Sequence, residues 1–90
     1  MGGKVRARPF EVWAAGWAYS HRFEWAAAFK YQDRAVERAR DIMRRSTHPK
    51  TPFFSRVREV RVTGPGEALV FRLWEEPGEL GHVREEDRRP

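Results

Sequence analysis

Hydrophobic and polar residues alternate along segments 10–19 and 22–31, and this pattern predicts an antiparallel β-hairpin. The register that pairs Val12 with Phe29 gives one face that is wholly apolar or glycine, with small residues opposite large ones. The turn residues are not of the asparagine–glycine type that two-residue hairpins favour, so a wider four-residue loop is an alternative. A helix through residues 26–28 is a second alternative, because alanine favours helices.

The next segment has the spacing of an amphipathic helix that starts at Gln32 and Asp33, with Asp33 as its N-cap. The predicted apolar stripe consists of Ala35, Val36, Ala39, Ile42 and Met43. The opposite side mixes arginine with acidic residues at three- and four-residue spacing. We interpret that side as a solvated face with local ion pairs.

Segments 56–62 and 68–74 flank a glycine- and proline-rich turn and predict a second hairpin. Pairing Val60 with Phe71 places both residues on the core face. The same register leaves Arg58 opposite an apolar residue, and a bulge near Arg58 would relieve that conflict.

Together these elements predict an α+β fold of β-β-α-β-β order, in which one helix packs on one face of a four-stranded antiparallel sheet. The strand order stays open. We expect residues 1–9 to form a basic flexible arm, residues 10–76 a single domain and residues 77–90 a disordered charged tail. The adjacent acids Glu75 and Glu76 are interpreted as surface carboxylates at the end of a strand.

Composition narrows the class of protein. A chain of 90 residues suits one small domain, and it contains no apolar run of membrane-spanning length and no signal-peptide pattern. There is no cysteine, which excludes disulfides, a thiolate nucleophile and cysteine-ligated metals. Only 3 of the 18 basic residues are lysine and asparagine is absent, a bias typical of a GC-rich bacterial or phage genome.

The sequence gives no support to catalysis. His21, His48 and His82 fall in a turn, a loop and the tail, without the spacing of a metal-binding pair. Neither a nucleophile elbow nor a phosphate-binding glycine loop is present. We therefore expect a protein that is not an enzyme and that uses no cofactor, no metal and no small-molecule substrate.

The candidate binding surface is the sheet face that the single helix cannot cover. The residues expected there are Trp13, Trp17, Tyr19, Arg22, Lys30, Arg61, Arg72 and Trp74. Several exposed tryptophans are unusual for a monomer, and tryptophan, tyrosine and arginine dominate binding hot spots. We predict an interaction module that binds a protein partner, or itself as a homodimer, through this face or through an exposed strand edge. A phage-encoded or accessory regulator in the cytoplasm, the host cytoplasm if phage-encoded, fits that hypothesis.

The alternative is a small nucleic-acid-binding protein that uses the same face. The net charge is +5, and the basic arm with Lys4, Arg6 and Arg8 would add contacts to phosphates. Aromatic rings on an open sheet stack unpaired bases. However, Glu11 and Glu24 are expected on that face, and no established nucleic-acid-binding motif occurs.

Overall fold

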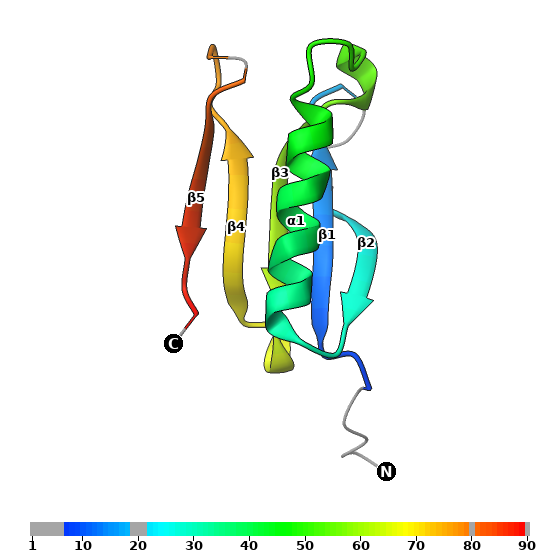
Figure 1. The fold of residues 1–90 in the computed structure, drawn as a ribbon, viewed down its shortest axis with the longest axis vertical. Coiled ribbons are helices and arrows are strands. Elements are labelled where there is room, and N and C mark those ends of the chain that lie inside the picture. The colour runs from blue at the N-terminus through cyan, green and yellow to red at the C-terminus, as the bar shows by residue number, and fades with distance from the viewer. Residues whose placement is uncertain (1–6, 19–21, 80, 90) are drawn as a thin grey trace.

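A computed structural model describes residues 7–18, 22–79 and 81–89 and confirms an α+β fold with one helix on an antiparallel sheet. The elements are β1 (Phe10–Gly16), β2 (Glu24–Phe29), α1 (Gln32–Ser46), the 3-10 turn η1 (Phe53–Ser55), β3 (Val57–Thr63), the 3-10 turn η2 (Pro65–Glu67), β4 (Leu69–Glu75) and β5 (Val83–Asp87). The strands lie in the order β2-β1-β3-β4-β5, and α1 runs along one face of the sheet (Figure 1). No helix in the described part of the chain is long and apolar enough to span a membrane.

The sheet has five strands rather than the predicted four, and the extra strand comes from the tail that was expected to be disordered. β5 pairs antiparallel with β4, and charged side chains link the two strands. Arg72 lies 2.9 Å from Glu86, and Arg84 forms an ion pair with Glu76. The prediction of disorder over 77–90 is wrong for β5 because backbone pairing and cross-strand charge pairs order this segment despite its few apolar residues.

The first hairpin forms in place of the helical alternative, but its register is two residues from the predicted one. Val12 pairs with Ala27, and a bulge opposite Trp13 leaves Ala26 as an extra residue in β2. A shift of two residues keeps Val12 and Phe29 on the helix side, where both contribute to the core. Beyond the bulge the alternation no longer holds, so side chains there depart from the predicted faces.

The second hairpin is displaced in the same way. Val60 pairs with Leu73, so Arg58 is not placed opposite that leucine. In the pairing of β3 with β1, a register shift between Ala15 and Gly16 leaves Arg58 as the extra residue. This bulge lies between β1 and β3 and not within the hairpin of β3 and β4, where a bulge near Arg58 was considered; there the register shift falls between Val62 and Thr63.

The core lies between α1 and the central strands. The predicted apolar stripe is confirmed: four of its residues are buried and Ile42 packs at the margin of the cluster. The strands contribute Val12, Val60, Val62, Phe71 and Leu73. One helix of this size covers only one face of the sheet. The described residues form no second α-helix that could cover the opposite face.

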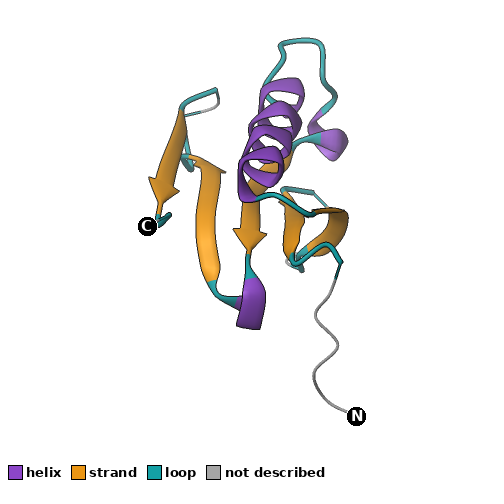
Figure 2. Cartoon of the chain, turned by 60° about the horizontal axis from the view of Figure 1, so that its bottom comes forward, coloured by secondary structure: helices purple, strands orange, loops and turns teal. Residues whose placement is uncertain are grey.

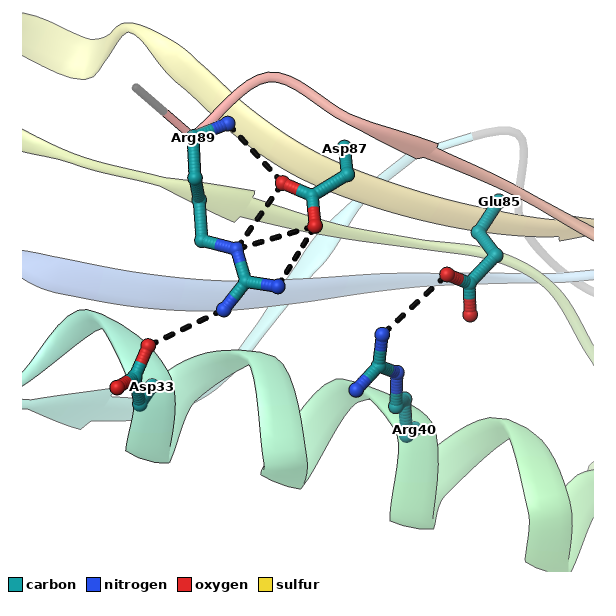
Figure 3. A network of polar contacts seen from close by, with 5 residues as sticks. All are labelled: Asp33, Arg40, Glu85, Asp87 and Arg89. Carbon is teal, nitrogen blue, oxygen red and sulfur yellow. Dashed lines mark hydrogen bonds and ion pairs between the residues drawn. The ribbon is translucent and has the colours of Figure 1, made fainter.

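Ion pairs link β5 and the residues that follow it to α1 (Figure 3). Arg89 joins Asp87 at 2.6 Å and Asp33 at 3.1 Å, while Arg40 lies 3.3 Å from Glu85. Asp33 is not the N-cap as predicted: the N-cap is Tyr31, two residues earlier, and it makes no side-chain capping hydrogen bond. Hydrogen bonds from the Arg89 side chain and amide lower the pKa of Asp87 to about 2. These contacts are one reason why the tail is ordered.

Candidate interaction surface

The sheet face opposite α1 is organised around Glu59. Figure 2 shows α1 over the other side of the sheet. Glu59 alternates with the core residues of β3, yet it is only 6% exposed because three arginines surround it. Its carboxylate lies 2.7 Å from Arg61, 3.5 Å from Arg72 and 3.8 Å from Arg58. The Glu59 carboxylate is therefore a counterion that these three arginines share.

Two of these arginines also stack on aromatic rings. The Arg61 guanidinium lies 4.2 Å from the centroid of Phe23, and the Arg72 guanidinium lies 4.2 Å from the centroid of Trp74. Guanidinium groups at this distance are attracted by the ring quadrupole. The stacks hold these rings and cations in fixed positions relative to one another.

Trp13 extends this cluster across β1. Its indole donates a hydrogen bond to the Thr63 hydroxyl at 3.3 Å. Trp13, Phe23 and Arg61 line a hollow of about 290 Å³ together with Glu11, Thr63 and Glu67. We call the set Trp13, Phe23, Arg61, Arg72 and Trp74 the aromatic–arginine face. Two of its members, Trp13 and Phe23, give the hollow an apolar wall beside the Arg61 cation.

β5 supplies a second acid to this face. Glu86 accepts a hydrogen bond from Arg72 at 2.9 Å and another from Arg88. The hydrogen bond from Arg88, followed by that from Arg72, lowers the pKa of the Glu86 carboxyl. The face is therefore an alternation of paired charges and not a purely basic surface.

Trp17 does not join the aromatic–arginine face. Its indole donates a hydrogen bond to Glu75 at 3.0 Å, and Glu75 lies two residues after Leu73, on the same core face of β4. Trp17 follows the end of β1 at Gly16 and lies beyond the register shift between β1 and β3, so the parity of the strand no longer predicts its side.

Glu75 itself is 1% exposed, which overturns its interpretation as a surface carboxylate. It accepts hydrogen bonds from Arg56 and from the Gly81 amide, both at 2.5 Å, as well as from Trp17. Burial raises the pKa of Glu75, but the hydrogen bonds from Gly81, Arg56 and Trp17 together outweigh burial and lower it. All the donors are protein groups, so this site is a structural anchor.

The other predicted residues are dispersed. Arg22 is exposed ahead of β2, and Lys30 is exposed after it, with its ammonium 5.6 Å from the Tyr31 ring. Arg8 lines a groove beside β2. Tyr19, Lys4 and Arg6 lie outside the described residues. Of the predicted set, the structure thus brings together Trp13, Arg61, Arg72 and Trp74.

Phe23 and Glu86 also lie on this surface, and neither was predicted there. The predicted hairpin register, continued along the strand from the pairing of Val12 with Phe29, places Phe23 on the helix side, but the bulge at Ala26 moves it to the other side. Glu86 belonged to the segment expected to be disordered, and its charged composition contains no signal for a strand. In the described parts of the chain, no three or more histidine, aspartate or glutamate side chains are grouped to hold a metal ion.

Comparison of the chain with protein-family models, with curated proteins and with solved structures finds no match. Its function is therefore to be inferred from the chemistry of its own surfaces.

Proposed function

We propose that this chain is a small non-enzymatic interaction module whose aromatic–arginine face binds a protein partner. The observation that carries this proposal is the gathering of three aromatic rings and two guanidinium groups on a sheet face that α1 leaves uncovered. Tryptophan and arginine are enriched among the residues that dominate protein–protein binding energy. Because the rings are already stacked, they lose little conformational entropy when a partner docks.

Nucleic acid is the second candidate for the same face, and the ion pairs count against it. Arg61 and Arg72 share Glu59, and Arg72 also contacts Glu86, so a phosphate would have to displace a carboxylate. Guanidinium groups also occupy positions over Phe23 and Trp74, where bases would stack. A protein surface that offers mainly apolar groups to the aromatic rings fits this arrangement better.

The proposal predicts that removing an aromatic ring from this face abolishes capture of a partner. The tagged full-length chain would be used to capture proteins from a nuclease-treated lysate of its source cells. We expect Phe23→Ala and Trp74→Ala to lower recovery of the captured protein at least about tenfold, as loss of a hot-spot contact does. Phe54→Ala is the matched control, because Phe54 is 61% exposed but lies in η1.

Quantitative mass spectrometry of the captured proteins gives the readout, and circular dichroism confirms that each variant is folded. Equal capture by the Phe23 and Phe54 variants would contradict the assignment of this face. Capture that disappears on nuclease treatment, together with salt-sensitive binding of an oligonucleotide by the pure chain, would favour the nucleic-acid function.

A further inference from the structure

The two edge strands of the sheet, β2 and β5, differ in charge. β5 has the sequence VREED, and its arginine and acidic side chains form ion pairs. β2 has the sequence EWAAAF, with one charged residue and no proline. Beyond the bulge at Ala26, residues 27–29 pair regularly with β1 on one side, and their other side is the open edge of the sheet. An uncharged, regular edge of this kind is a template for another strand.

A groove of about 600 Å³ lies between this edge and the flank of α1. Its apolar floor includes Ala27 and Phe29, which pack against the core cluster. Charged side chains also line it, four arginines and two acids: Arg8, Arg34, Glu37, Arg38, Asp41 and Arg44. A smaller hollow of about 410 Å³ shares Arg8 and Arg34 with the groove and adds Lys30. The groove therefore combines an apolar floor, an open strand edge and an excess of positive charge.

The arginines of this groove are only partly neutralised within the chain. One carboxylate, that of Asp41, lies 3.0 Å from Arg44, 3.2 Å from Arg45 and 3.6 Å from Arg38. Within residues 7–18, 22–79 and 81–89, neither Arg8 nor Arg34 takes part in an ion pair. Segment 1–9 contains no acid and contributes Arg8 to the groove itself, so acids that complement these arginines have to come from another molecule.

The spacing of Arg34 and Arg38 matches the spacing of side chains along a strand. α1 runs along the strands of the sheet (Figure 1), and residues four apart on a helix are separated by roughly 6 Å along its axis. Side chains on one face of a strand repeat about every 7 Å. In a strand added beside residues 27–29, the side chains opposite Ala27 and Phe29 share the face of the sheet that carries α1. Acids at these two alternate positions would approach the two arginines.

We propose that the groove between β2 and α1 binds an extended acidic segment of a protein partner, which adds as a strand to β2 and places acids at alternate positions against Arg34 and Arg38. In strand addition, backbone hydrogen bonds give affinity and contacts to alternate side chains give specificity. A nucleic acid would meet the arginines but has no peptide groups to pair with the edge of β2. The inference does not rest on the proposed function, because it uses the edge of the sheet and the function uses the aromatic–arginine face.

Synthetic peptides test the charge and its spacing together. The probe is a fluorescently labelled peptide in which glutamate alternates with threonine. Its control has the same length and composition but the repeat Glu-Glu-Thr-Thr, so no two glutamates are two residues apart. At low salt we expect the full-length chain to bind the alternating peptide about fivefold more tightly, the effect of one exposed ion pair. Fluorescence anisotropy gives both dissociation constants, and equal values would contradict the proposed arrangement.

Charge reversal tests the location of the site. Arg34→Glu and Arg38→Glu should each weaken binding of the alternating peptide at least about tenfold, because an attraction becomes a repulsion. Lys50→Glu makes the same change in charge at an exposed loop position and should leave the dissociation constant near the wild-type value. The double variant Arg34→Glu/Arg38→Glu should bind a peptide of alternating lysine and threonine more tightly than the wild type does. Circular dichroism confirms that each variant is folded.

N-Methylation of the peptide tests pairing with β2 separately from charge. In an added strand, the N–H groups of alternate residues point towards the neighbouring strand and the others point away from it. One peptide is methylated on the backbone nitrogens of its glutamates and a second on those of its threonines. One of the two should lose binding while the other keeps it, and equal affinities would overturn strand addition.

Four further results would overturn the inference. The alternating peptide does not bind at low salt, or it binds Arg34→Glu as tightly as the wild type. A single-stranded oligonucleotide that binds as tightly as the peptide, and that is also released by Arg34→Glu, would assign the groove to nucleic acid. A dimer of the chain that dissociates in Arg34→Glu would assign it to a second copy. Loss of partner capture in neither Phe23→Ala nor Trp74→Ala, with peptide binding as expected, would count against the proposed function alone.

Discussion

Replacement of Glu75 by leucine is expected to destabilise the fold by about 3–5 kcal/mol, the usual cost of removing one partner of a buried ion pair. The Glu75 side chain is fully buried, and the side chain of its partner Arg56 is only 11% exposed. Leucine leaves Arg56, the Gly81 amide and the Trp17 indole without their acceptor. The Arg56 Nε atom is already buried without a hydrogen-bond partner, so no other bond compensates.

A core of this size supplies only about 3–5 kcal/mol of net stability, so the leucine variant should be largely unfolded at 25 °C. Urea titration followed by tryptophan fluorescence measures the change. The adjacent Glu76→Gln is the control: its partner Arg84 is 60% exposed, and an exposed pair contributes at most about 1 kcal/mol. Adding Arg56→Met to the leucine variant should recover stability by removing the unpaired charge. A loss below about 1 kcal/mol in Glu75→Leu would contradict the role of this anchor.

The buried carboxylate of Glu75 should also make the free energy of unfolding sensitive to acid. Its pKa is lowered in the folded chain from an ordinary value of 4.5, so the unfolded chain binds a proton more readily than the folded one. The stabilisation is therefore complete above pH 4.5 and is lost as pH falls through the folded pKa. Unfolding measured from pH 6 to about pH 3 should show a smaller slope for Glu75→Gln than for the wild type. Equal slopes would show that Asp41, Glu86 and Asp87, whose pKa values are also lowered, account for the acid sensitivity.

Alternation and helical spacing predicted which residues form the core. When one face of a strand is buried, every second residue points into the core, so the apolar residues must occupy those positions. The helix stripe from Ala35 to Met43 and the strand residues Val12, Val60 and Phe71 all lie where the pattern placed them. The pairing register was two residues off in both hairpins, since a slip of two preserves every face and changes only the neighbours. Periodicity therefore could not distinguish the observed register from the predicted one.

The candidate interaction surface was less predictable because register shifts determine which residues belong to it. Phe23 and Trp17 both lie beyond register shifts, and each leaves the side that simple alternation assigns to it. Glu75 was misplaced for another reason: its partner Arg56 is 19 positions away and meets it only after β3 and β4 pair. Nothing in the local sequence distinguishes a carboxylate with such a partner from one at the surface.

Glu59→Gln is expected to cost about 1–2 kcal/mol of stability, less than the loss of Glu75, although both are carboxylates held by arginine. The smaller loss of stability follows from the solvent exposure of the arginines around Glu59. The side chains of Arg58, Arg61 and Arg72 are 31–42% exposed, so they can turn towards water when Glu59 loses its charge. Urea titration of the two variants side by side checks this order, and a larger loss in Glu59→Gln would contradict it.

The larger effect of Glu59→Gln should be on binding. Without the shared counterion, Arg58 and Arg61 lose their carboxylate partner beside Phe23, and Arg72 beside Trp74 keeps only Glu86. The variant should therefore bind a single-stranded oligonucleotide at low salt at least about tenfold more tightly than the wild type, with affinity that falls as salt rises. Glu37→Gln makes the same change in net charge on the exposed side of α1 and should show no such gain. If the two variants bind alike, Glu59 is not what keeps this face from phosphates, and the preference for a protein partner over nucleic acid loses its main support.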